Sequence, residues 1–167
     1  TAIRCNQIVA CGLPYTMLNQ EHIVNVLMTV RQHLLTPAGL RSLSPLHPMF
    51  ESTYKENPIE QEAAATNGAV WVWPLMFYIE CAMKLDGERF LPHAEEMLAA
   101  FDDNIQTYCI GSVAEYYDAN PPFAPRGAVS QAWSVGGVLY IKHLIEKYKA
   151  KAKRATKRTA TKKSVKK

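Results

Sequence analysis

The 167-residue sequence has no apolar stretch long enough to cross a membrane. Its most apolar run, residues 69–79, is much shorter than the roughly 20 residues that a membrane-spanning helix needs, and Pro74 interrupts it. No secretory signal opens the chain, which begins at Thr1 without a methionine. We therefore expect a cytoplasmic protein with no membrane partner, and the start at Thr1 is typical of a piece of a longer chain.

The sequence also lacks the cysteine and histidine spacings of a metal site. Its four cysteines form no CxxC pair, and its five histidines do not cluster. A chain of this size, with 48% hydrophobic residues, builds a core without a disulfide framework. We expect free thiols in a reducing compartment, no metal and no cofactor.

Acidic residues are missing from the end of the chain. Residues 149–167 hold ten lysines and arginines, so residues 1–148 hold nine basic and all 15 acidic residues, a net charge of −6. We predict two parts: a folded part over 1–148 and a disordered, low-complexity tail over 149–167. Weak contact of the tail with a polyanion and a merely solvating tail are both open alternatives.

Apolar periodicity predicts five helices. Segments that are apolar all round alternate with segments that are apolar on one face, which is typical of inner helices covered by outer ones. The sequence therefore predicts an all-α, two-layer array whose long loops gather at one end. A strand over 70–73 and a short helix over 59–65 remain open. The five helices are expected over residues 5–18, 20–35, 69–85, 88–107 and 128–149.

The loop over residues 111–133 concentrates chemistry-bearing side chains. Its three prolines exclude a helix, and a loop of this length is usually functional or disordered. Its aromatics Tyr116, Tyr117 and Phe123 argue against disorder. It also holds Glu115, Asp118 and Arg126, and we expect the arginine to hold one of the two carboxylates in place.

Four segments of the sequence resemble the C-terminal glucosidase domain of glycogen debranching enzymes, most closely the bacterial-type amylo-α-1,6-glucosidase group. They lie in the family's order and spacing, and the similarity covers nearly all of 3–145. The segments are NQIVACGLP (6–14), LLTPAGLRSLSP (34–45), NGAVWVWPL (67–75) and GSVAEYYDANPPFAPRGAVSQAWSV (111–135). The resemblance implies an (α/α)6 toroid, of which this chain would be the last part.

The resemblance also implies an activity, the inverting hydrolysis of α-1,6-linked glucose in glycogen or a limit dextrin. Inversion needs two carboxyl groups roughly 6.5–9.5 Å apart, one to protonate the leaving oxygen and one to activate water. By motif position Glu115 would be the general base. The matching acid is an Asp on an earlier part of such domains, and no segment here matches it. We therefore expect this chain to be inactive alone, and its partner to be the rest of the toroid or a second copy.

Candidate sugar-binding residues follow from the same motifs. They are Trp71, Trp73, Asn67, Tyr116 and Arg41, with Asp118 and Arg126 expected to shape the site. For the two tryptophans a place in the core is the alternative. The alternative role for Asn67 is to cap a helix. The alternative role for Arg41 is to pin a loop through hydrogen bonds to backbone carbonyls.

The sequence departs from the family pattern at Ala65 and Thr66, where the family usually has Tyr and His. The basic tail is not part of that pattern either. The alternative function is therefore a non-catalytic helical remnant, or a glucan- or polyanion-binding protein that uses the tail.

Overall fold

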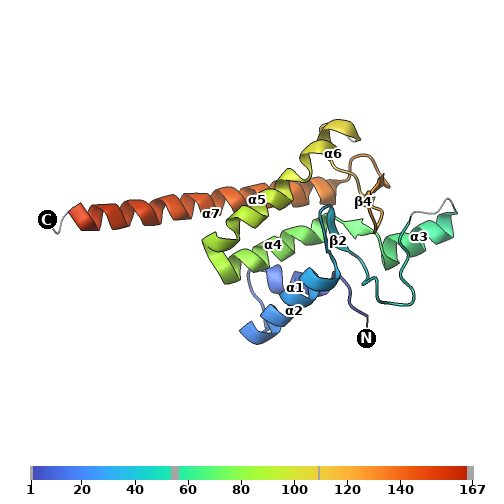
Figure 1. The fold of residues 1–167 in the computed structure, drawn as a ribbon, viewed down its shortest axis with the longest axis horizontal. Coiled ribbons are helices and arrows are strands. Elements are labelled where there is room, and N and C mark those ends of the chain that lie inside the picture. Colours follow the sequence, from blue (N-terminus) through green and yellow to red (C-terminus); the bar gives the residue numbers. More distant parts are fainter. Residues whose placement is uncertain (1, 54–56, 109, 165–167) are drawn as a thin grey trace.

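The computed structural model describes residues 2–53, 57–108 and 110–164. A row of three helices forms its centre (Figure 1). The helices are α1 (Gln7–Gly12), α2 (Gln20–His33), α3 (Pro58–Asn67), α4 (Trp73–Asp86), the 3-10 helix η1 (Gly87–Phe90), α5 (Leu91–Ala99), α6 (Asp102–Thr107) and α7 (Ala132–Ser164). The strands are β1 (Leu35–Thr36), β2 (Gly39–Arg41), β3 (Val70–Trp71), β4 (Tyr116–Tyr117) and β5 (Pro125–Arg126).

The inner and outer helices alternate as the apolar pattern predicts. Helix α4 packs between α1 and α7, while α2 covers α1 and α4, and α5 covers α7. Asn19 caps α2, because its Oδ1 accepts a hydrogen bond of 2.9 Å from the N–H of His22. Pro74 and Pro92 lie in the first turns of α4 and α5, where a missing N–H costs nothing.

One predicted helix is divided. Residues 88–107 form η1, α5 and α6 rather than a single helix. The α-helical hydrogen-bond pattern is interrupted at Phe101, whose N–H donates to the carbonyl of Leu98, three residues earlier. The ring of Phe101 is fully buried. Burial of this ring accounts for the break, since neither Gly nor Pro occurs there.

The prediction of an all-α protein is wrong in one respect, because the two long loops form a small antiparallel sheet in the order β1-β2-β3-β4-β5. Strand β3 joins the first loop to the second: Val70 pairs with Tyr117 and Trp71 with Tyr116. Of the two open alternatives, the strand over 70–73 is present only as Val70–Trp71, ahead of the favoured helix, and the short helix over 59–65 lies within α3. The loops do gather at one end of the helices, where this sheet fastens them together.

The prediction of a disordered tail is also wrong for the residues that the structure describes. Helix α7 continues through Ser164 and projects from the body of the protein (Figure 1). Residues 149–164 contain Ala, Lys and Arg, which are good helix formers, and no Gly or Pro. Because the packed first half of α7 supplies the costly nucleus, each further residue only has to propagate the helix.

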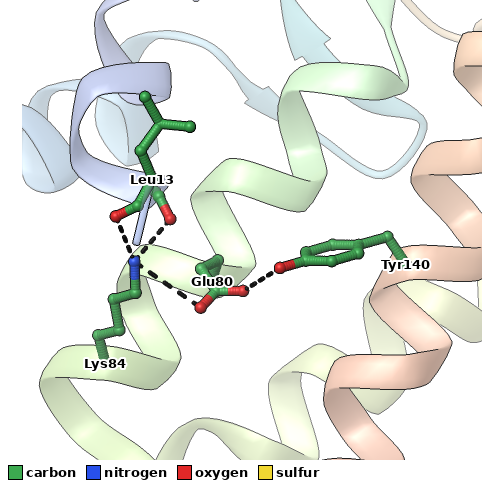
Figure 2. Close-up of polar contacts among 5 residues, drawn as sticks. Leu13, Glu80, Lys84 and Tyr140 are labelled. Carbon is green, nitrogen blue, oxygen red and sulfur yellow. Dashed lines mark hydrogen bonds and ion pairs between the residues drawn. The ribbon is translucent and has the colours of Figure 1, made fainter. Parts of the chain in front are cut away.

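A polar cluster ties the three central helices together (Figure 2). Glu80 of α4 is 9% exposed, and its Oε2 accepts a hydrogen bond of 2.8 Å from the hydroxyl of Tyr140 in α7. Its Oε1 lies 3.7 Å from the Nζ of Lys84. Lys84 also donates to the carbonyls of Gly12 and Leu13 at the end of α1, at 2.6 and 2.7 Å. The lysine therefore satisfies carbonyls that a helix end leaves without partners.

Three cysteines are free thiols in the core, and burial raises the pKa of Cys5 to about 11 and that of Cys81 to about 12. The third is Cys11, and Cys109 lies outside the described residues. In the part of the chain that the structure describes, no helix is both long enough and apolar enough to cross a membrane.

Candidate functional site

The hairpin of β4 and β5 positions Glu115. The residue lies directly before β4, where its N–H donates to the carbonyl of Ala128 at 3.0 Å. In return, the N–H of Ala128 donates to the Oε2 of Glu115 at 2.9 Å. The hydroxyl of Ser134, in the first turn of α7, donates to the Glu115 carbonyl at 3.0 Å. The half-buried carboxylate is thus held by backbone rather than by a cation.

Gly127 allows the chain to turn against this carboxylate. Its φ is +72°, a conformation that L side chains rarely adopt. A Cβ at this position would lie 2.5 Å from the Oε2 of Glu115 and 2.8 Å from the ring of Tyr116. The glycine therefore serves two needs at once, the positive φ and the space beside the glutamate.

Asp118 and Arg126 close the hairpin one residue beyond β4. The Nη2 and Nε of Arg126 donate to the Oδ2 of Asp118 at 2.8 and 3.1 Å. The N–H of Asp118 also bonds to the carbonyl of Ala124 at 2.9 Å. The arginine thus contacts Asp118, one of the two carboxylates considered from the sequence.

Trp71 and Trp73 line a cleft of about 250 Å³ between the sheet and the N-terminal ends of α4 and α7. Trp71 lies in β3 and Trp73 is the first residue of α4, and both are half-buried. The remaining lining residues are Arg4, Cys5, Asn6, Ser42, Ala65, Thr66 and Trp133. A cleft with three indoles and few polar groups has the composition of a small-molecule site.

Tyr116 connects this cleft to the glutamate. Its ring lies 5.2 Å from that of Trp71 between centroids, at an angle of 36°. The indole N–H of Trp71 donates to the carbonyl of Ala65 at 2.9 Å, which fixes the ring at the cleft wall. Glu115 precedes Tyr116 in the chain but does not line the cleft itself. The structure therefore brings Trp71, Trp73 and Tyr116 together, with Glu115 one residue away.

Asn67 and Arg41 have other partners. Asn67 is the last residue of α3, so the prediction that it caps the following helix is wrong. Its Oδ1 accepts a hydrogen bond of 2.8 Å from the Nη2 of Arg4. The Nε of Arg41 donates to the carbonyl of Ala119 at 2.9 Å, so this arginine pins the loop after β4. Burial lowers the pKa of Arg41.

Two residues that line the cleft, Arg4 and Trp133, were not among the candidates from the sequence. Arg4 bonds to Asn67 and, through Nη1, to the carbonyl of Thr66 at 2.8 Å, so it supports the cleft wall from more than 60 residues away. Trp133 is 65% exposed and stands edge-on to Trp73, 6.2 Å between ring centroids. Arg4 lies two residues before the motif NQIVACGLP and Trp133 lies inside the motif over 111–135, and these two motifs are the only sequence signals near the two positions.

A second, apolar groove of about 620 Å³ shares Trp73 and Trp133 with the cleft. It runs along α4 and α7 on the side facing away from α5 and is lined by Val9, Trp73, Met76, Phe77, Ala132, Trp133, Gly136, Gly137 and Tyr140. Within the described residues, no group of three His, Cys, Asp or Glu side chains could hold a metal ion. The chemistry that the arrangement offers is that of a fixed carboxylate beside aromatic surfaces.

The family described as amylo-alpha-1,6-glucosidase matches residues 1–140 of the chain. No curated protein matches the chain. The matched residues include the whole hairpin, the cleft and the groove.

Proposed function

Since the chain belongs to the amylo-alpha-1,6-glucosidase family, we propose that it is a segment of a glycoside hydrolase that releases α-1,6-linked glucose from glycogen or a limit dextrin with inversion of configuration. The family match over residues 1–140 carries the proposal. The geometry adds to it a carboxylate held in place beside an aromatic cleft.

Glu115 is the general base in this proposal. The Ala128 N–H fixes Oε2, and we assign Oε1 to the water that attacks the sugar. A backbone donor suits this role, because it fixes the orientation of the carboxylate without placing a second side chain in the path of the attacking water. The half-buried position gives water access to the carboxylate.

The general acid comes from another part of the toroid. Asp118 is the nearest carboxylate in the sequence, but Arg126 engages it and it lies three residues from Glu115 on the same hairpin. An inverting pair needs roughly 6.5–9.5 Å between carboxyl groups on opposite faces of the sugar. The chain by itself is therefore inactive.

The remaining helices of an (α/α)6 toroid cover the apolar groove in this proposal. The groove exposes Trp133 and Tyr140 along α7, and such a surface needs a cover in water. A second copy of the chain is the alternative cover. Analytical ultracentrifugation of the chain and of a complete domain separates the two: a dimer of both indicates the second copy, and self-association of the chain that the complete domain lacks indicates the remaining helices. A stable monomer of the chain with an exposed groove would count against both.

The cleft is the glucose-binding part of the site, and Trp71 supported by Tyr116 is its platform. The test is titration of limit dextrin into the chain, followed by tryptophan fluorescence and calorimetry. We expect Trp71→Ala to weaken binding about tenfold, the effect of losing roughly 1.4 kcal/mol of aromatic contact.

The matched control is Tyr15→Ala, which removes an aromatic ring that is 94% exposed in the loop after α1. It should leave the affinity unchanged. Equal effects of the two substitutions would contradict the cleft as the sugar site. Release of glucose from a limit dextrin by the chain alone would contradict the missing acid.

One observation favours the second candidate, a remnant that binds glucan without catalysis. Ala65 and Thr66, where the sequence departs from the family pattern, both line the cleft. The small side chain of Ala65 leaves space that a larger one would fill. If Ala65→Tyr with Thr66→His tightens limit dextrin binding, the chain has lost a sugar contact; unchanged binding would speak against the remnant.

A further inference from the structure

The second half of α7 leaves the body of the protein. The first half is packed, with Ile141, Leu144 and Ile145 buried against the core. Lys149 pairs with Glu95 of α5, at the edge of the body. Beyond it the helix continues to Ser164 and projects from the body (Figure 1). At 1.5 Å per residue, this part is about 22 Å long.

This projecting half carries charge of one sign only. Residues 149–167 contain ten basic residues and no acid, while the body has a net charge of −6. Like charges recur at the spacing of one helical turn, as in Lys149 with Lys153 and Arg154 with Arg158. Such pairs destabilise an isolated helix. A polyanion along the helix would remove this repulsion and stabilise the helical state.

We propose that the projecting residues 149–164 of α7 bind double-stranded nucleic acid through its phosphates. A duplex presents about one charge per 1.7 Å of its axis, so a helical rod of basic residues meets phosphates along its whole length. The major groove, roughly 12 Å wide, accepts an α-helix with its side chains. The acidic body is repelled, which restricts the contact to the projecting half.

The composition of the segment selects the duplex over other polyanions. It has no aromatic residue, and single-stranded nucleic acids are held by stacking of bases on aromatics. The sequence of the segment has no apolar period, so it offers no apolar face to insert into a lipid surface. Contacts to phosphates carry no sequence information, so the proposed binding is independent of base sequence.

The test is fluorescence anisotropy of a labelled 20-base-pair DNA duplex, with the full chain and with a variant that lacks residues 149–167. We expect the deletion to weaken binding at least about tenfold at low salt. For the full chain, log K should fall against log salt with a slope between about −5 and −9, the range for six to ten phosphate contacts. Unchanged binding after the deletion, or a slope near zero, would overturn the proposal.

The choice of partner is tested with the same chain. Single-stranded DNA of equal length, polyglutamate and vesicles with anionic lipid should each compete more weakly than unlabelled duplex. Equal or tighter binding of any of the three would overturn the assignment to a duplex. It would indicate a single strand, an acidic protein or a membrane surface, respectively.

The helical mode is tested by Ala155→Pro, which interrupts the helix and leaves all ten charges. We expect it to weaken duplex binding about threefold with an unchanged salt slope, whereas Lys157→Gln with Arg158→Gln should make the slope shallower by about 1.8. Equal affinity of Ala155→Pro and the unchanged chain would overturn the helical mode. Residues 149–167 lie outside the matched residues 1–140, so these results are independent of glucan hydrolysis.

Discussion

Two glutamates of this chain are held in contrasting ways. Glu80 lies inside the helical core, where a tyrosine hydroxyl and a lysine ammonium engage its two oxygens. Glu115 lies in the loop region, half-buried, with a backbone N–H on one oxygen. The first carboxylate links α1, α4 and α7, and the second is attached to a hairpin.

The contrast separates a carboxylate that supports the fold from one that is suited to chemistry. A buried carboxylate needs compensating partners, and a cation beside it lowers its basicity. A half-buried carboxylate that is oriented by the backbone keeps its access to water. The predictions below test whether the two glutamates divide stability and activity in this way.

The largest effect is expected for Glu115→Gln in a complete glucosidase domain that includes this segment. Loss of the general base should lower the rate of glucose release from limit dextrin by about 10²–10⁴-fold. The melting temperature should not change, because a glutamine oxygen still accepts the Ala128 hydrogen bond. Full activity in this variant would remove Glu115 from the mechanism.

The next effect is expected for Glu80→Ala, which should lower the free energy of unfolding by about 2–3 kcal/mol in urea denaturation. This is less than the roughly 3–5 kcal/mol of a fully buried pair, because the Lys84 side chain is 34% exposed and keeps its carbonyl partners. Glu115→Ala is the control and should cost less than 1 kcal/mol, roughly one exposed hydrogen bond. Equal costs would erase the contrast between the two glutamates.

A glycine pair sharpens the contrast at the hairpin. Gly127→Ala and Gly87→Ala both force alanine into a positive φ, of +72° and +58°. The positive φ should cost each variant about 1–2 kcal/mol of stability, and Gly127→Ala should cost more because of the close contacts that its Cβ would make. Only at Gly127 would the new Cβ meet the Glu115 carboxylate, whereas no atom lies within 4 Å at Gly87. Limit dextrin hydrolysis by the complete domain should therefore fall only for Gly127→Ala, and equal activities would contradict the positioning role.

The smallest effect is expected for Tyr140→Phe, about 1 kcal/mol at neutral pH for one hydrogen bond. Burial, followed by the hydrogen bond to Glu80, raises the pKa of Tyr140 to about 12 from 10.0. The neutral phenol therefore contributes stability that is fully present below pH 10 and is lost as the pH rises towards 12. Urea denaturation across this range should show a steeper loss for the unchanged chain than for Tyr140→Phe, and parallel curves would contradict the linkage.

Much of the fold follows from local patterns. The amphipathic segment after Asn19 forms α2, and the apolar segment that follows Val72 forms α4, because periodicity and caps act within one or two turns. The contact of Arg126 with Asp118 could also be predicted from the sequence, because the two residues are only eight positions apart in one loop. The sheet was missed because its strands have only two or three residues each, too few for an alternating pattern.

The candidate site divides in the same manner. Glu115, Asp118 and Arg126 were found because one loop contains them all. The clamp from Arg4 to Asn67 was not, because it joins residues 63 positions apart. The exposure of Trp133 was not predicted either, because its position in a helix does not tell a buried aromatic from an exposed one.

By itself, the sequence determined most of the helices of the body, the loop that holds the glutamate and the uneven distribution of charge. Each of these depends on neighbours in the chain, where propensity, periodicity and charge act directly. Only the tertiary structure decided that two loops pair into one sheet, that three tryptophans face one cleft, and that Glu80 is compensated while Glu115 is oriented by backbone. Those outcomes depend on which distant segments come into contact. Hydrogen bonds and burial stabilise such a contact only after the fold has brought the partners together.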